Sequence, residues 1–466
     1  MKNQRSIFLV PCSILFLASC SLSRQISKDA DALLLRDSAA SKGFTGISIY
    51  EPATGKYWYN YNATKYFTPA SNTKLFSLYA GMKFLGDSLP GLKYQYAENG
   101  AVNIFPTGDP TLLHPDFVHQ PVLDFLNREK GKCNYSDWGW KEKALGYGWA
   151  WDDYNDDYMV ERSSFPIYGN IIRLQYENVG YSNRKVNIKW KTLPAYFNIF
   201  VDSINTSPLF QGKIDSVNVS SELLKFYAKR DWETNKIHLI QASSVFKYQE
   251  LPFHTENNAL AVDILNKDFS LDINKGTALI QHFPVYPPSG KSFIIHSQPT
   301  DSLFKPMMHR SDNFFAEQTL LMVSNERLGY MSDADIIDTL LNNDLKDIPQ
   351  RPKWVDGSGL SRYNLFTPQA FIYILNKLYF EFGLKRLKTI LPTGGEGTLR
   401  SFFNKDSGFI YAKTGTLSNN CALSGFLITN KGKLLIFSIL ANHYQSGATL
   451  VRRATEAFLT GIRRKY

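Results

Sequence analysis

The chain has 466 residues, of which 44% are hydrophobic and 20% are charged, and its net charge at pH 7 is +10. The aromatic share of 14% excludes a disordered protein, and the length predicts about two to four domains. The sequence contains neither an internal repeat nor a run of lysine and arginine typical of a nucleic-acid-binding arm, so we expect no nucleic-acid partner.

Residues 1–19 have the features of an export signal. Lys2 and Arg5 precede an apolar stretch over residues 7–18, which is shorter than the ~20 residues that a membrane-spanning helix needs. The stretch ends in Leu17-Ala18-Ser19-Cys20, which resembles a bacterial lipobox. We therefore expect a lipid on Cys20 that anchors the exported protein to the periplasmic face of an envelope membrane, with the outer membrane favoured. The alternative is an ordinary secretory signal with an incidental cysteine, which predicts a soluble periplasmic protein.

Removal of Lys2 and Arg5 with the signal leaves a net charge of +8, which favours proximity to anionic envelope polymers. A merely basic soluble surface explains this charge equally well. Cys133 and Cys421 then remain unmodified, and they can form one disulfide in an oxidising compartment if their geometry permits it.

The segment after the signal predicts a helix, two strands and a second helix. Apolar residues over 26–34 have helical spacing, and residues 43–50 and 57–61 are typical of strands joined by a turn. The second helix begins near Ser71 and is expected to be amphipathic and to stop at Gly86. Its apolar face comprises Leu75, Leu78, Tyr79, Met82 and Leu85.

Residues 93–292 differ in character from both ends of the chain. Turn-rich stretches and short alternating apolar runs, such as Lys185–Trp190 and Ala259–Ile264, replace long helical periods. We expect a mostly β insertion that forms one region or two small subdomains.

Helical patterns resume over 303–328, and a further helix opens at Thr367-Pro368, a cap followed by proline in the first turn. Three strands follow, over 409–412, 423–429 and 433–440, with a hairpin turn at residues 430–432 between the last two. A final helix over 449–462 is expected to pack on the sheet. Residues 20–92 and 293–466 are thus predicted to build one discontinuous α/β domain.

The sequence Ser71-Asn72-Thr73-Lys74 is the first candidate for catalysis. A serine hydroxyl needs a base to become a nucleophile, and a lysine three residues along a helix shares its face. The same spacing recurs at Ser182/Lys185, Ser244/Lys247 and Ser302/Lys305, so only the start of the apolar helix distinguishes Ser71.

Two later motifs complete the candidate site. Ser311-Asp312-Asn313 offers a hydroxyl that can relay a proton and a carboxamide that can hold a substrate amide, although the same residues also suit a helix cap. Lys413-Thr414-Gly415-Thr416 lies in a predicted edge strand. Lys413 and Thr414 could bind a carboxylate, Gly415 allows close approach, and the Thr416 and Ser71 amides could form an oxyanion hole. A strand end with a solvated lysine is the plainer alternative.

In this order the three motifs resemble the signature of active-site serine penicillin-binding proteins and β-lactamases. The interval between the first and second motifs is more than twice that between the second and third. Such an insertion resembles the D-alanyl-D-alanine carboxypeptidase/endopeptidase group of low-molecular-mass penicillin-binding proteins. Further pieces resemble the same group from about residue 30 to the C-terminus: Gly108-Asp109-Pro110-Thr111-Leu112, Trp151-Asp152-Asp153-Tyr154 and residues 356–364.

The resemblance implies an antiparallel sheet flanked by helices (an α+β variant of the α/β class), with a mostly β insertion. It implies that Ser71 is acylated, that Lys74 is the base, and that Ser311 and Asn313 handle the proton relay and the substrate amide. Lys413 and Thr414 would take the terminal carboxylate of a peptidoglycan stem peptide. Asp153 and Arg362 lie where the group contacts the stem diamino acid, or they are structural ion-pair partners. β-Lactams would be covalent inhibitors, and neither metals nor organic cofactors are implied.

The sequence argues against several alternative functions. A class A β-lactamase carries a Glu-x-x-Leu-Asn pattern between the later motifs, which this chain lacks. A non-catalytic wall-binding lipoprotein is unsupported because the motif residues are intact. No His-Glu-x-x-His occurs, and Gly357-Ser358-Gly359 lacks the nucleophile-elbow pattern. Residues 394–398 are expected to form a tight loop near the site, because no Lys-Ser/Thr follows to make a phosphate cradle.

Overall fold

The two ends of the chain meet in one five-stranded antiparallel sheet. The computed structural model describes residues 22–182, 185–197, 199–201, 216–219, 226–241, 248–256, 258–275 and 291–466. The strand order is β14-β15-β16-β1-β2, with bounds Ile410–Leu417, Asn420–Ile428, Leu434–Asn442, Phe44–Glu51 and Lys56–Tyr61. β1 pairs with β16 over seven residue pairs from Phe44/Asn442 to Tyr50/Ile436, which joins the N-terminal segment to the C-terminal one.

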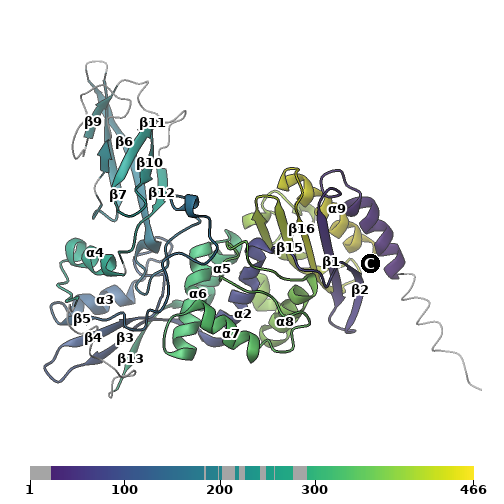
Figure 1. Cartoon of the computed structure of the whole chain (residues 1–466), viewed down its shortest axis with the longest axis horizontal. Coiled ribbons are helices and arrows are strands. Elements are labelled where there is room, and N and C mark those ends of the chain that lie inside the picture. The colour runs from purple at the N-terminus through teal and green to yellow at the C-terminus, as the bar shows by residue number, and fades with distance from the viewer. Residues whose placement is uncertain are drawn as a thin grey trace, which may run out of the picture.

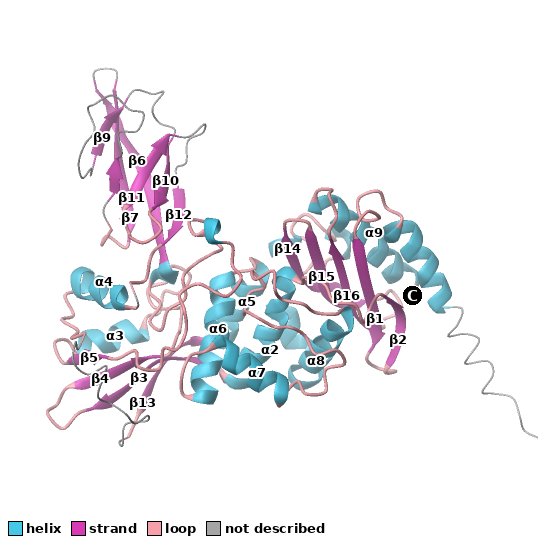
Figure 2. Cartoon of the chain, in the orientation of Figure 1, coloured by secondary structure: helices cyan, strands magenta, loops and turns pink. Residues whose placement is uncertain are grey.

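Helices cover both faces of this sheet (Figures 1 and 2). An N-terminal helix over 22–30, continued by η1 (Asp31–Leu35), and α9 (Ala448–Lys465) lie on one face. The other face packs on a helical layer of α2 (Lys74–Phe84), α5 (Thr300–His309), α6 (Asn313–Leu328), α7 (Asp333–Asn342) and α8 (Pro368–Ile390). The predicted sheet flanked by helices is confirmed, and β14 is its edge strand.

The helix after Ser71 differs from the amphipathic helix predicted. Every side chain from Lys74 to Met82 is buried, because α6 and α8 enclose α2 on the sides that the sheet leaves free. The predicted stop is confirmed: Leu85 caps the helix and Gly86 has φ +70°, a left-handed conformation that suits glycine.

The insertion begins with a four-stranded sheet of order β13-β3-β4-β5, formed by Phe293–Pro299, Ser88–Tyr96, Val102–Pro106 and Cys133–Tyr135. The expected boundary after residue 92 falls inside β3, which pairs with β13 after the long excursion. Two helices, α3 (Pro121–Arg128) and α4 (Ala259–Phe269), share the apolar core of this part. The strand-like interpretation of Ala259–Ile264 is therefore wrong: the segment is the start of α4.

A second part of the insertion consists of two small β-sheets that project from the first part (Figure 1). One sheet has the order β12-β6-β7-β9, with bounds Tyr248–Pro252, Ile171–Ser182, Lys185–Leu193 and Ser216–Val219. The other has the order β10-β11-β8, with bounds Phe226–Arg230, Ile237–Gln241 and Ile199–Val201. The strand predicted over Lys185–Trp190 is confirmed within β7.

The two remaining cysteines are both buried free thiols. Cys133 lies in the core of the insertion and Cys421 in the core between the sheet and α9, so the disulfide that the sequence allowed does not form. Residues 1–19 and Cys20 lie outside the described part of the chain. Among the described helices, none is both long and apolar enough to cross a membrane.

Candidate active site

Ser71 lies in a 3₁₀ turn, η2 (Ala70–Thr73), that runs directly into α2. Ala70 has φ +48°, a left-handed conformation that is costly for a residue with a Cβ and is often found at functional sites. Ser71 is partly exposed, whereas residues 72–82 behind it are buried. The turn therefore presents the Ser71 hydroxyl at the surface of a rigid core.

Lys74 lies directly beneath Ser71 with no exposed surface. Its Nζ donates to Ser71 Oγ at 3.0 Å, to Asn313 Oδ1 at 2.5 Å and to the Ser358 carbonyl oxygen at 2.8 Å. Burial lowers the pKa of Lys74 from 10.5 to about 8, against the opposing effect of nearby carboxylates, of which Asp356 is the strongest. A substantial neutral fraction near physiological pH fits a general base.

The second motif forms the turn between α5 and α6. Ser311 has φ +64°, and Asp312 caps α6 by accepting from the Phe315 N–H at 3.0 Å. The capping role therefore belongs to Asp312, which leaves Ser311 and Asn313 to face the site. Asn313 uses both ends of its carboxamide, because its Nδ2 donates to the Tyr158 carbonyl oxygen at 2.8 Å.

Lys413 reaches the second motif from the edge strand β14. Its Nζ donates to Ser311 Oγ at 2.8 Å and to the Thr414 carbonyl oxygen at 2.6 Å. Burial lowers the pKa of Lys413 well below its ordinary value, and the positive charges of Lys74 and Arg452 lower it further. The structure thus brings all three motifs together. By contrast, Ser302, which with Lys305 repeats the spacing of the first motif on α5, donates through its hydroxyl to the Pro299 carbonyl oxygen, and this hydroxyl makes no other described hydrogen bond.

Gly415 lets β14 lie against the nucleophile turn. A Cβ on Gly415 would be 2.6 Å from the Pro69 carbonyl oxygen and 3.1 Å from the amide nitrogens of Ser71 and Asn72. The close approach predicted for this glycine is therefore made by the chain's own backbone. With its carboxamide nitrogen toward β14, Asn72 donates to the Lys413 carbonyl oxygen at 2.7 Å. This hydrogen bond joins the turn that carries Ser71 to the edge strand.

The loop at residues 356–361 supports the nucleophile turn from the other side. Asp356 is fully buried and accepts from the amides of Gly359 and Ser361 at 2.8 and 2.6 Å. The loop delivers the Ser358 carbonyl oxygen to Lys74, and Gly359, with φ +84°, touches Ala70. The residues at 394–397 also pack near the site, because a Cβ on Gly397 would be 2.4 Å from the His309 carbonyl oxygen.

We expect Gly359→Ala to impair activity by disturbing the turn that carries Ser71. The new Cβ would lie 1.9 Å from the Ala70 carbonyl oxygen, so backbone must shift, and φ +84° is strained for alanine. Initial rates should fall by roughly 10-fold or more, since a 1 Å misplacement can cost about 10²-fold. Gly432→Ala is the control, because Gly432 also has positive φ but nothing within 4 Å of its Cβ position. Equal activity of the two variants would contradict this role for Gly359.

A buried ionic network lies behind Lys74. Glu317 on α6 accepts from the Ser358 N–H at 2.7 Å, and burial raises its pKa to about 7. Arg162 from the insertion, with 1% of its side chain exposed, faces three carboxylates: Asp333 at 2.5 Å, Glu142 at 3.2 Å and Glu317 at 3.5 Å. This network fixes the insertion to α6 and partly neutralises Glu317, one of the carboxylates whose charge acts on Lys74.

We expect Arg162→Ala to lower the free energy of unfolding by about 3–5 kcal/mol, because it leaves carboxylates buried without their cation. Urea denaturation of the full chain measures this loss. Arg128→Ala removes a pair with Glu129 in which the arginine is mostly exposed, and a contact with the Phe125 ring, and it should change stability by only about 1 kcal/mol. If the two variants are equally stable, the buried network contributes little.

Comparisons with known proteins agree with this geometry. The family model of the D-Ala-D-Ala carboxypeptidase 3 (S13) family matches residues 27–461. The chain belongs to this S13 family. It is 24% identical to a D-alanyl-D-alanine carboxypeptidase from Actinomadura, over 96% of this chain and 87% of the relative. The crystal structure of penicillin-binding protein 4 from Haemophilus influenzae superposes with a TM-score of 0.68 at 19% identity, covering 94% of this chain and 99% of that one. The same protein in complex with a β-lactam gives a TM-score of 0.62 at 19% identity and the same coverage.

Membership in the S13 family makes the chain a serine-type D-Ala-D-Ala carboxypeptidase that acts on peptidoglycan, as the resemblance of its motifs predicted. Within the described ranges, no group of three or more histidine, cysteine, aspartate or glutamate side chains is arranged to hold a metal ion.

Asp153 and Arg362 lie at the margin of the S13 site. Burial raises the pKa of Asp153, and the charge of Arg362 acts in the opposite direction, so the two side chains share one electrostatic environment. Arg362 is exposed and donates to the Ser418 carbonyl oxygen at 3.3 Å. Among the described contacts, they do not form an ion pair with each other.

A cavity of about 500 Å³ adjoins the second motif. Ser311 and Asn313 line it from the catalytic domain, and Asp157, Arg173 and Glu250 line it from the insertion. Its volume lies in the range of small-molecule sites. The insertion therefore contributes walls beside the second motif.

Three contributors to the site were assigned no individual role from the sequence, although Ser358 lies in the segment 356–364 that resembles the peptidase group. Ser358 acts through its carbonyl oxygen, which any residue type supplies. Glu317 lies on α6 four residues after Asn313, and no sequence motif marks it. Tyr158 belongs to the insertion and contacts Asn313 through its backbone carbonyl oxygen, which any residue type supplies.

Proposed function

We propose that Ser71 is the nucleophile of this S13 peptidase and that Lys74 is its base. Neutral Lys74 accepts the Ser71 hydroxyl proton as Oγ attacks the carbonyl carbon of the penultimate D-alanine. The tetrahedral intermediate expels the terminal D-alanine, whose nitrogen receives a proton through Ser311. Water then hydrolyses the Ser71 ester and releases the shortened stem peptide. The observation that carries this proposal is the pair of contacts Lys74–Ser71 and Lys413–Ser311, together with the bond from Lys74 to Asn313.

The remaining site residues are proposed to bind substrate. Lys413, Thr414, Gly415 and Thr416 line the edge strand along which the peptide would lie, with its terminal carboxylate near the first two. The amides of Ser71 and Thr416 would form the oxyanion hole, a role supported by the approach of β14 to the turn. One N–H of Asn313 is used by Tyr158, and the second remains to donate to the substrate amide.

The substrate is proposed to be a peptidoglycan stem peptide, either a free pentapeptide or a crosslinked peptide in which the D-alanyl bond is cut. Asp153 and Arg362, as groups of opposite charge at the margin, are suited to the amino and carboxylate groups of a diamino acid side chain. The cavity beside Ser311 offers room for the larger leaving group of a crosslinked peptide. Acylation by β-lactams is supported by the β-lactam complex of the Haemophilus protein, and we expect slow release because no class A deacylating motif is present.

Purified protein incubated with a fluorescent penicillin should become covalently labelled, and mass spectrometry should locate the label on the peptide that contains Ser71. The same protein should release D-alanine from disaccharide pentapeptide. Labelling on another peptide would move the nucleophile elsewhere. A protein that neither labels nor releases D-alanine would support a wall-binding role without catalysis.

We further propose that the protein is exported to the periplasm as a lipoprotein, with Cys20 as the lipidated residue. The support is the segment Leu17-Ala18-Ser19-Cys20 after a short apolar stretch. Cells expressing the full chain should incorporate radioactive palmitate into it, and Cys20→Ala should abolish incorporation. Cys12→Ala, within the same signal, should leave it intact. Incorporation that survives Cys20→Ala contradicts the anchor.

A further inference from the structure

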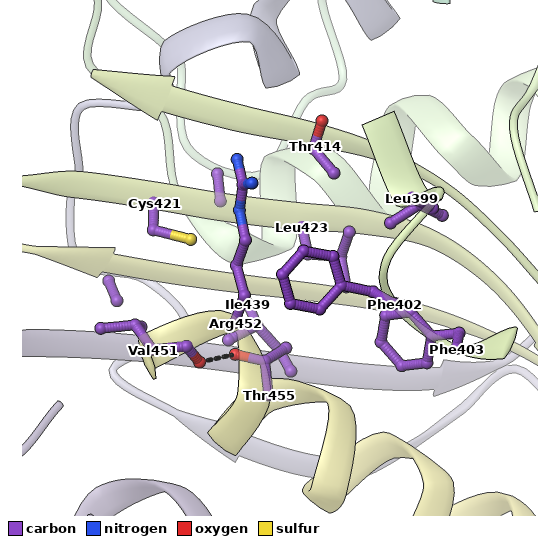
Figure 3. A pocket seen from close by; sticks show the side chains of 12 residues that line it. Leu399, Phe402, Phe403, Thr414, Cys421, Leu423, Ile439, Val451, Arg452 and Thr455 are labelled. Atoms are coloured by element: carbon purple, nitrogen blue, oxygen red, sulfur yellow. Dashed lines mark hydrogen bonds between the residues drawn. The ribbon is translucent and has the colours of Figure 1, made fainter. Parts of the chain in front are cut away.

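Arg452 reaches the edge strand β14 from α9, the helix that covers the face of the sheet opposite the helical layer that contains α2. It lies near the start of α9, and its guanidinium Nη2 donates to the hydroxyl of Thr416 on β14. Figure 3 shows the long Arg452 side chain extending from the helix across neighbouring strands, past Cys421, in the direction of Thr414. Thr416 is exposed, so this contact lies at the surface of the domain.

The guanidinium of Arg452 lacks the carboxylate partner that neighbouring arginines have. Arg453 pairs with Glu456 at 2.5 Å and Arg463 with Asp406 at 3.1 Å. Among the described residues no acidic side chain pairs with Arg452. Its guanidinium carbon lies 5.7 Å from the centre of the Phe402 ring, and its side chain also neighbours the Cys421 thiol. Its Nε–H is buried and has no acceptor in the part of the chain that the structure describes. A buried N–H without an acceptor calls for a structural or functional explanation.

The position of Arg452 relates it to the carboxylate end of the proposed groove. Thr416 follows Lys413 and Thr414 on the same strand, and Thr414 and Arg452 line one small apolar pocket. The positive charge of Arg452 contributes to lowering the pKa of the buried Lys413 ammonium. Arginine remains protonated at all physiological pH values. Arg452 therefore supplies a permanent positive charge to this end of the strand even when Lys413 is neutral.

Resting on the function proposed above, we propose that Arg452 is a specificity-determining residue that recognises the free terminal carboxylate of the substrate together with the Thr416 hydroxyl. A planar guanidinium beside a hydroxyl matches a carboxylate in charge and in donor geometry. The chain would thus select peptides with an unblocked terminal carboxylate, a group that both a terminal D-alanine and a crosslinked D-amino acid carry.

The test compares two substrates that differ only at the terminus: a disaccharide pentapeptide ending in D-Ala-D-Ala and its carboxamide. Arg452→Gln should lower kcat/KM for the carboxylate substrate by roughly 10- to 100-fold, the range of a hydrogen bond to a charged group. The carboxamide substrate should change by less than about 3-fold, so the preference of the wild type for the carboxylate should shrink by roughly the same 10- to 100-fold factor, leaving only what Lys413 and Thr414 contribute. Arg453→Gln, one residue along the same helix, should retain the preference.

An equal loss on both substrates would mean that Arg452 only holds Thr416 in place, and no loss on either would remove it from recognition; both results overturn the inference. Should the glutamine variant fail to fold, Arg452→Lys decides. Lysine keeps the charge without the two-pronged geometry, so the carboxylate preference should be reduced, and an unchanged preference overturns the inference. A wild type inactive on both peptides would instead contradict the proposed function itself.

Discussion

Ser71→Ala is expected to lower kcat/KM for D-alanine release by roughly 10⁴- to 10⁶-fold and to abolish covalent labelling by penicillin. The alanine methyl group cannot form the ester on which the proposed reaction depends. The fold should be unaffected, because Ser71 is partly exposed and its Oγ contacts Lys74 alone among the described hydrogen bonds. The stability change should therefore stay within about 1 kcal/mol. Gel fluorescence, D-alanine release and thermal denaturation of the same preparations measure the three quantities.

Ser302→Ala is the matched control for this experiment. Ser302 and Lys305 repeat the spacing of Ser71 and Lys74 on helix α5, but the Ser302 hydroxyl donates to the Pro299 carbonyl oxygen and approaches neither later motif. This variant should label and hydrolyse like the wild type. Undiminished labelling of Ser71→Ala would exclude Ser71 as the nucleophile, whatever its geometry.

The catalytic domain was predictable where local chemistry determines local structure. The cap-and-proline start at Thr367-Pro368 is confirmed, since the Thr367 hydroxyl accepts from the Ala370 N–H at 3.0 Å. The hairpin turn at residues 430–432 joins β15 to β16 as predicted. Each of these features is encoded within a few residues, so no knowledge of tertiary contacts was needed.

Segments whose conformation depends on distant partners were not predictable in the same way. The apolar run at Ala259–Ile264 is too short for its period to distinguish strand from helix, and packing against the insertion core makes it α4. The amphipathic pattern expected for α2 failed because α6 and α8 cover its remaining faces. Arg162 and Arg452 reach the site from the insertion and from α9, and nothing in their own sequence neighbourhoods marks either one.

The pH dependence of the reaction should report the ionisation of Lys74. Its pKa is lowered from 10.5 to about 8, and the proposed base must be neutral, so activity should rise as pH increases through 8. About one tenth of Lys74 is neutral at pH 7 and about nine tenths at pH 9, which predicts a roughly 10-fold rise in kcat/KM. Glu317→Gln removes a negative charge that favours the protonated lysine, so the rise should move to lower pH.

Lys74→Arg separates the role of Lys74 as a base from its role as a positive charge. Arginine keeps the charge beside Asn313 but cannot deprotonate, so kcat/KM should fall by roughly 10²- to 10⁴-fold at every pH, and the rise near pH 8 should vanish. Lys83→Arg on the same helix, where Lys83 pairs with Glu381 and Asp344 away from Ser71, should retain the wild-type profile. Because Lys74→Arg keeps the positive charge of protonated Lys74 and leaves the Ser71 hydroxyl in place, an active variant with an unchanged profile would assign the proton transfer to another group. Lys413 would then be the leading candidate, since its ammonium is also buried and donates to the Ser311 hydroxyl.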